Sequence, residues 1–278
     1  MRLRVPEAGD LLETFVVANL GFLGVDIAVA HSANGFAARM EWAPLAFSAV
    51  ATALLLPGLL RRDVRRSMRA ISLACGAAAI AVGVAGMLFH LRSGFFERET
   101  LHALVYSAPF IAPLSYVGVG LLLVLSRMEP AGSAEWSVWV VLLALGGFAG
   151  NLGLSLLDHA QNGFFSPLEW IPVAGAAFAV AFLGVALFRR EDRILLRACV
   201  WVLVFETILG LLGAALHVRA DLRSAAPLAA RILFGAPVFA PLLFCNLALL
   251  AWIGLREFPG QRVAAPAADR MDTALRAG

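Results

Sequence analysis

A polar pattern that occurs twice constrains this chain more than any other feature of its sequence. Residues 31–44 and residues 159–172 share His-x-x-Asn-Gly-Phe-x4-Glu-Trp-x-Pro and match at seven of fourteen positions without a gap. Two further pairs of similar segments follow in the same order: His90-Leu-Arg92 matches His217-Val-Arg219, and Ala108–Leu114 matches Ala236–Leu242. The offset of about 128 residues is too long for a solenoid repeat. We therefore predict a tandem duplication of one unit.

Composition indicates that this unit lies in a membrane. Hydrophobic residues make up 61% of the chain and charged residues only 15%, whereas about a quarter of the residues in a soluble domain are charged. The mean hydropathy is +0.84. The predicted partner is thus the lipid bilayer. We exclude nucleic acid, because the arginines behind the net charge of +3 are divided among short loops without interleaved surface aromatics.

Apolar stretches of about 20 residues, the length that spans a bilayer core, set the fold class. They cover residues 11–31, 43–60, 70–90, 103–126, 136–157, 168–188, 196–217 and 231–255. The sequence predicts an all-α polytopic membrane protein with eight transmembrane helices in two tandem four-helix repeats, residues 1–130 and 131–260. A disordered cytoplasmic tail, residues 261–278, follows. Because each repeat has an even number of spans, a pseudo-twofold axis along the membrane normal should relate the two.

Arginine counts predict the orientation. The side shared by both termini carries sixteen arginines and the opposite side six. By the positive-inside rule both termini are cytoplasmic. We expect a multi-pass protein of a bacterial-type inner membrane.

The polar residues that recur in both halves all fall at the extracytoplasmic ends of the predicted helices. They are His31, Glu41 and His90 in the first half, and His159, Glu169 and His217 in the second. Ionisable groups at membrane depth are costly and usually line a bundle interior or a wet cavity. Neutral imidazole is the commonest metal ligand, and carboxylates often complete such sites. We therefore predict these six residues as metal ligands, although capping of helix ends is an alternative role for them.

The set of two histidines and one carboxylate is typical of non-haem metal sites with open positions for substrate. If the first and third helices of each half lie diagonally in a bundle, their histidines face one another across its axis. Iron is the favoured metal, and zinc or copper also suits these ligands. Residues expected to position a substrate or cofactor are Asn34, Arg92, Asn162 and Arg219.

Haem b competes for the same histidines. Glycines lie seven and four residues before the third-helix histidine in both halves, at positions 83 and 86 and at 210 and 213. They fall on the same helical face as the imidazole and would give a macrocycle a flat wall, while the arginines would pair with propionates. However, Gly-x-x-Gly equally marks close helix packing, and haem leaves Glu41 and Glu169 without a role. We favour a non-haem metal.

Three other features concern the helices themselves. Prolines four residues apart, at 109 and 113 and at 237 and 241, lie near the starts of the fourth and eighth helices, where the second of each pair should kink the helix and free carbonyls. Glu206 is mid-helix in the second half only, which suggests divergent roles for the halves, such as proton handling. The three cysteines do not match between the halves and are predicted to be buried apolar residues.

These features predict a membrane metalloprotein that performs redox or oxygenase-type chemistry on a lipid-soluble or periplasmic substrate, with a periplasmic redox or metal-donor partner. One alternative is a metal-ion transporter or metal-delivery protein. Another is a zinc-dependent lipid hydrolase in which the glutamate acts as a general base.

Overall fold

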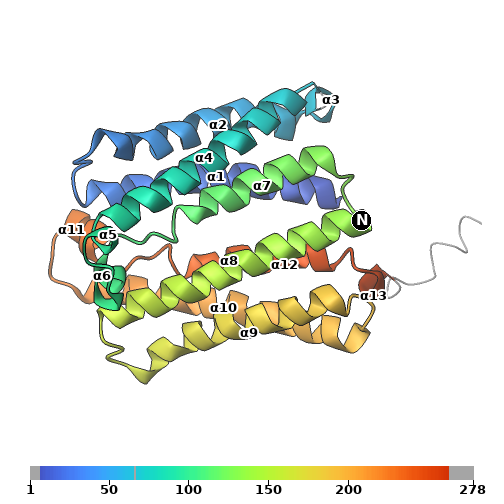
Figure 1. The fold of residues 1–278 in the computed structure, drawn as a ribbon. Coiled ribbons are helices and arrows are strands. Elements are labelled where there is room, and N and C mark those ends of the chain that lie inside the picture. Colours follow the sequence, from blue (N-terminus) through green and yellow to red (C-terminus); the bar gives the residue numbers. More distant parts are fainter. Residues whose placement is uncertain (1–6, 66, 263–278) are drawn as a thin grey trace, which may run out of the picture.

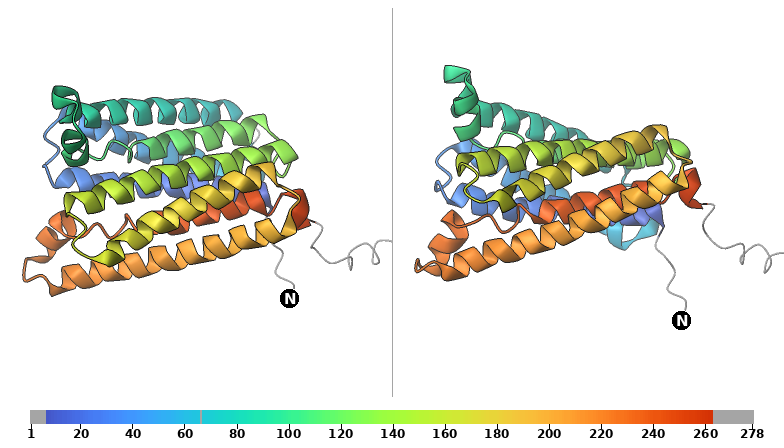
Figure 2. Two further views of the ribbon diagram at one scale, coloured as in Figure 1. Left: turned by 60° about the horizontal axis from the view of Figure 1, so that its bottom comes forward. Right: turned by 90° about the horizontal axis from the view of Figure 1, so that it is seen from below.

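The computed structural model describes residues 7–65 and 67–262, and every element in that part of the chain is helical. The long helices run along one common direction, with the first half (blue to green) beside the second half (yellow to red) (Figures 1 and 2). In chain order the elements are α1 (Ala8–Ser32), η1 (Arg39–Glu41), α2 (Trp42–Leu60), α3 (Arg62–Arg65), α4 (Arg69–Arg92), α5 (Phe95–Arg98), α6 (Leu101–Tyr106), α7 (Leu114–Met128), α8 (Ala134–Gln161), η2 (Pro167–Glu169), α9 (Trp170–Phe188), α10 (Arg193–Arg223), α11 (Leu228–Phe234), α12 (Leu242–Leu255) and α13 (Pro259–Arg262).

Six of these segments are long and apolar enough to cross a membrane: Ala8–Ser32, Arg39–Leu60, Arg69–Arg92, Ala134–Gln161, Pro167–Phe188 and Arg193–Arg223. Large apolar side chains such as Phe188 and Trp201 are exposed on their outer surfaces, as expected for side chains that face lipid. The chain is therefore a multi-pass helical membrane protein. Eight spans and the pseudo-twofold axis remain predictions.

The predicted helices over 103–126 and 231–255 are each broken in two. In place of the first, α6 is followed by an irregular segment and by the 15-residue α7; in place of the second stand α11 and the 14-residue α12. At 1.5 Å per residue α7 and α12 reach only about 22 Å, short of the roughly 30 Å core. Each helix begins directly after a proline, Pro113 or Pro241. The second proline thus starts a helix and does not kink one, because it lacks the N–H that an upstream turn would need.

Side-chain caps define other helix starts. The Ser133 hydroxyl accepts the Trp136 N–H at the start of α8, and the Asp192 carboxylate accepts the N–H groups of Ile194 and Leu195 at the start of α10. These bonds satisfy amides that the first helical turn leaves without a partner. The last helix, α13, includes residues 261 and 262, the first two residues of the predicted tail. Residues 263–278 lie outside the described part of the chain.

Helix neighbours place α1 and α4 on opposite corners of the first half. Both pack on α2 and on α7; in the second half, α8 and α10 both pack on α9 and on α12. This is the diagonal arrangement that the histidine spacing requires. The halves meet where α7 packs on α8 and α1 on α12, and the amides of Asn19 and Asn246 exchange two hydrogen bonds of 3.2 and 2.5 Å across that boundary.

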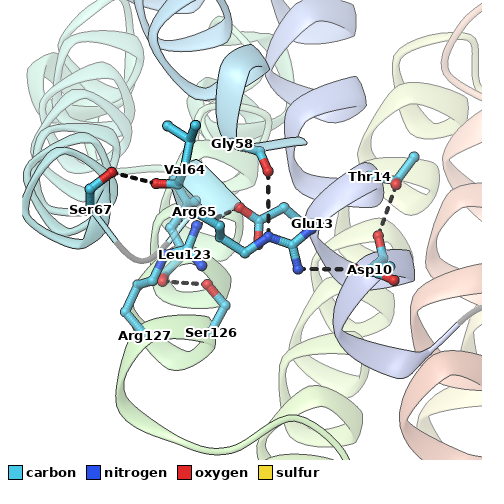
Figure 3. A network of polar contacts seen from close by, with 10 residues as sticks. All are labelled: Asp10, Glu13, Thr14, Gly58, Val64, Arg65, Ser67, Leu123, Ser126 and Arg127. Carbon is cyan, nitrogen blue, oxygen red and sulfur yellow. Dashed lines mark hydrogen bonds and ion pairs between the residues drawn. The ribbon is translucent and has the colours of Figure 1, made fainter. Parts of the chain in front are cut away.

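The two ends of the bundle differ in chemistry. At the arginine end, where α1 begins and α3 and α13 lie, Glu13 is only 6% exposed and pairs with two arginines (Figures 1 and 3). Its carboxylate contacts Arg127 Nη2 and lies 3.6 Å from Arg65 Nε, while Arg65 Nη1 is 3.0 Å from Asp10. The opposite end, with α5, α6 and α11, holds the recurring histidines and is called the histidine end below.

Candidate functional site

The repeated His-x-x-Asn-Gly-Phe pattern forms the same tight turn after α1 and after α8. Gly35 and Gly163 have φ values of 68° and 70°, and the next residues, Phe36 and Phe164, have φ values of 53° and 48°. A Cβ on Gly35 would meet nothing within 4 Å, so backbone conformation and not packing requires glycine there. Each phenylalanine N–H donates to the carbonyl of the histidine five residues earlier, at 3.0 and 3.1 Å. The turn therefore fixes the direction in which the chain leaves the histidine.

A phenylalanine with positive φ is strained, and both phenylalanines are held by the recurring tryptophan. Phe36 stacks on Trp42 with ring centroids 4.1 Å apart, and Phe164 stacks on Trp170 at 4.0 Å. The two stacks connect the end of the first helix to the start of the second in each half. They also bring the glutamate that precedes the tryptophan back to the histidine.

Each glutamate faces Nδ1 of the histidine on the neighbouring helix. Glu41 Oε2 lies 3.5 Å from His31 Nδ1, and Glu169 Oε2 lies 3.4 Å from His159 Nδ1. These distances fit an ion pair but are long for a hydrogen bond. His31 Nδ1 and Glu41 Oε2 are buried and have no hydrogen-bond partner among the described residues, so each is the other's polar neighbour.

The third-helix histidines are held through Nδ1 as well, but by backbone carbonyls. His90 Nδ1 is 3.0 Å from the carbonyl oxygen of Pro109, and His217 Nδ1 is 2.9 Å from that of Pro237. Each carbonyl belongs to the first proline of the Pro-x-x-x-Pro pair, in the irregular segment before α7 or α12. Each oxygen also accepts the backbone N–H three residues later, from Ala112 at 3.1 Å or from Ala240 at 3.2 Å, so the imidazole takes the second acceptor position of the carbonyl.

The two recurring histidines of the first half lie close together. The His31 and His90 rings have centroids 6.2 Å apart with planes tilted by 37°. In the second half the Asp158 carboxylate lies within electrostatic range of both His159 and His217. No Nε2 atom of these four histidines has a hydrogen-bond partner within residues 7–65 and 67–262. Four imidazoles thus have Nδ1 facing an acceptor and Nε2 open.

The two halves differ around the glutamate. Glu41 Oε1 accepts from Asn34 Nδ2 at 3.2 Å and from the Ala38 N–H at 3.3 Å. Asn162 instead reaches the Asp158 carbonyl at 3.5 Å, and both Glu169 oxygens are buried without a hydrogen bond in the described chain. Asn34 therefore contacts the glutamate of the first site, whereas Asn162 makes no bond to Glu169; the predicted contact of either asparagine with a substrate or cofactor stays a prediction.

Other residues singled out by the sequence lie apart from these contacts. Arg92 and Arg219 are exposed, and neither forms a hydrogen bond or an ion pair with the described residues, so their contact with a substrate or cofactor remains a prediction. The fifth histidine, His102, is exposed on α6 and stacks on Tyr106 with centroids 4.6 Å apart.

The paired glycines serve helix packing. A Cβ on Gly83 would lie 2.7 Å from Val117 and 2.8 Å from the Pro113 carbonyl, and one on Gly86 would lie 2.9 Å from Pro113. In the second half, Gly210 and Gly213 approach Cys245 and Pro241 in the same way. The faces that were expected to flank a haem are thus occupied by α7 and α12.

No group of three or more His, Cys, Asp or Glu side chains in the described residues has a spacing that would hold a metal ion. Both glutamates approach Nδ1 of the histidine and not its Nε2. Sequence reasoning did not identify the proline carbonyls as partners of the histidines, although the repetition of Ala-Pro-x-x-Ala-Pro in both halves was a signal for them. No family model, curated protein or solved structure matches this chain.

Proposed function

We propose that this protein is a membrane metalloprotein with a transition-metal site at the histidine end of each half. The ligands are His31 and His90 in the first site, and His159 and His217 in the second. The observation that carries the proposal is that all four Nδ1 atoms face an acceptor while all four Nε2 atoms remain open.

Such an arrangement is what a metal-binding histidine requires. An acceptor at Nδ1 favours the tautomer with the proton on that nitrogen, which leaves the Nε2 lone pair available for a metal. Partners of this kind orient the imidazole and raise its basicity, and their loss typically costs 10–100-fold in metal affinity. We assign Glu41 and Glu169 to this positioning role in place of the ligand role that the sequence suggested.

Ring spacing in the first half supports a shared ion. Two imidazoles bound through Nε2 on opposite sides of one metal, at about 2.0 Å each, have ring centroids about 6 Å apart. The observed separation between His31 and His90 is 6.2 Å. Two nitrogen ligands leave further coordination positions open for water, oxygen or a substrate.

Non-haem metal is favoured over haem b because α7 and α12 fill the glycine faces beside His90 and His217. Iron in such a site supports redox or oxygenase-type chemistry on a lipid-soluble or periplasmic substrate, with electrons or metal supplied by a periplasmic partner. A zinc-dependent hydrolase would need the glutamate as a base at a metal-bound water, whereas both glutamates face an imidazole. A transporter would need polar groups along the whole path, and few lie in the described helix interiors.

Metal analysis of single-histidine variants tests the proposal. His90→Ala and His217→Ala should each remove about half of the bound metal from the detergent-purified protein. His102→Ala is the matched control, because that imidazole is exposed and belongs to neither pair. Purified protein without metal or haem, or an equal loss in His102→Ala, would overturn the proposal.

A further inference from the structure

An apolar groove lies between α7 and α8 at the arginine end, where α7 ends and α8 begins (Figure 1). Its volume is about 300 Å³, and its walls include Leu121, Val124 and Met128 of α7 and Trp139 and Leu143 of α8. Within each helix these residues are three, four or seven positions apart, so they form one stripe along its surface. Met128 is 67% exposed and Trp139 is 45% exposed. In a membrane-spanning bundle, a groove with such walls opens to the lipid.

Two carboxylates lie at the mouth of this groove. Glu129 directly follows α7 and Glu135 lies in the first turn of α8, and both line the groove. Neither carboxylate forms a hydrogen bond or an ion pair with the described residues. The neighbouring Arg127 is held by Glu13 of α1 instead (Figure 3). Two like charges at one groove repel each other, and a cation between them removes this repulsion.

The duplicated chain contains a second version of this junction, where α12 packs on α1. With the offset of 128 residues, Met128 corresponds to Arg256 and Glu129 corresponds to Glu257. Arg256 Nε is 3.0 Å from Glu257 Oε1, and the guanidinium lies over the Trp252 ring, 5.4 Å from its centroid. In the second junction the chain itself thus supplies a cation to the carboxylate and an aromatic face to the cation.

The first junction leaves the corresponding positions open. Val124 stands where the second junction has Trp252, so the volume of an indole is vacated on the α7 side. The methionine that replaces the arginine leaves Glu129 without a cation from α7. Trp139 on the opposite wall still presents an aromatic ring to the groove, and such a ring attracts an ammonium group. The groove is therefore complementary to a cation that carries an apolar chain.

We propose that this groove binds a phospholipid whose head group carries a primary ammonium, in the leaflet at the arginine end. The ammonium lies between Glu129 and Glu135 and donates hydrogen bonds to their oxygens, while an acyl chain lies along the apolar stripes of α7 and α8. A primary ammonium has three N–H donors. A trimethylated ammonium has none, so a choline head group binds more weakly. The proposal does not rest on metal binding, because the histidine pairs lie at the other end of the bundle.

Native mass spectrometry of the full-length protein in detergent tests this site. Phosphatidylethanolamine, phosphatidylcholine and phosphatidylglycerol with identical acyl chains are added in turn. The ethanolamine lipid should bind once per chain, about tenfold or more tightly than either of the others. Its affinity should fall by about tenfold or more in the double variant Glu129→Gln, Glu135→Gln. Glu191→Gln, which alters an exposed carboxylate at the same end, is the matched control and should bind as the wild type does.

Exchange of residues between the two junctions provides a second test. Val124→Trp with Met128→Arg gives the first junction the groups of the second and should abolish the preference for the ethanolamine lipid. The reverse pair, Trp252→Val with Arg256→Met, opens the second junction and should add a second bound ethanolamine lipid. A gain of binding requires folded protein, so the opened variant decides the matter if the filled variant does not fold.

Three results would each overturn the proposal: equal binding of the three lipids, unchanged affinity in the double glutamine variant, or no second lipid in the opened variant. A preference for phosphatidylglycerol would overturn it as well, in favour of anionic-lipid binding by the arginines of this end. Metal content should be the same in all of these variants. Failure of this inference is therefore distinguishable from failure of the metal sites.

Discussion

Replacing the two recurring glutamates by glutamine should weaken the two metal sites unequally. In the first site, Glu41 Oε1 accepts two hydrogen bonds, from Asn34 and from the Ala38 N–H, while Oε2 faces His31 Nδ1. A glutamine that keeps its oxygen in the doubly bonded position presents its NH2 group to His31 Nδ1. That nitrogen must then become an acceptor, which moves the imidazole proton to Nε2 and blocks the metal.

The alternative orientation of the glutamine is also costly. Turning the amide by 180° restores an acceptor at Nδ1 but places the NH2 group against two donors, with a loss of about 0.5–1.5 kcal/mol per hydrogen bond. Either orientation gives a penalty of about 1–3 kcal/mol, so we expect metal affinity in the first site to fall 10–100-fold. Glu169 has no such bonds. Its glutamine can turn freely, and we expect a loss of only a few-fold.

Titration of the metal-free protein with Zn²⁺ measures this difference. Each site is observed alone, with Glu41→Gln in a His217→Ala background and Glu169→Gln in a His90→Ala background. Glu97→Gln, which changes an exposed carboxylate on α5 at the same end, is the control and should have no effect. Equal losses at the two sites would refute the hydrogen-bond argument, and a complete loss at both would restore the glutamates as metal ligands.

Three further predictions concern the fold. Gly35→Ala should destabilise the protein by about 1–2 kcal/mol, because alanine must adopt a left-handed conformation; Gly146→Ala, in a helical position open on its Cβ side, should be neutral or stabilising in the same thermal unfolding assay. Asn19→Leu removes the amide pair between the halves and should lower stability by about 0.6–1.7 kcal/mol, and an unchanged melting temperature would show that this pair does not hold the halves together. Reporters fused near Ser67 and at the C-terminus should report cytoplasm, and one near Arg39 should report the outside; an external Ser67 would reverse the orientation.

The apolar stretches of the sequence predicted six of the helices well and two of them poorly. Apolar runs located the six long helices, because length and hydropathy alone determine such segments. The same criterion failed over 103–126 and 231–255, where hydropathy continues but Pro113 and Pro241 interrupt the hydrogen bonds of the backbone. Hydropathy indicates whether a segment lies in lipid or in water, but it does not indicate how the N–H and C=O groups of its backbone are hydrogen-bonded.

For the candidate site, the sequence identified residues but not the contacts between them. Duplication identified the four histidines and two glutamates, and the structure brings the histidine of one helix to the glutamate of the next. The role of the glutamate depends on which imidazole nitrogen it faces, and no residue spacing carries that information. Gly83 and Gly86 were ambiguous as well, because a helix face without side chains can pack against a haem macrocycle or against another helix. The contact of both glycines with Pro113 shows that α7 packs there.

X-ray absorption at the metal edge of the purified protein tests the central claim most directly. We predict one transition-metal ion per histidine pair, with imidazole nitrogens in its coordination sphere that disappear in a variant lacking all four histidines. A bound metal whose spectrum shows no imidazole scattering, or a spectrum that the four substitutions leave unchanged, would contradict the account.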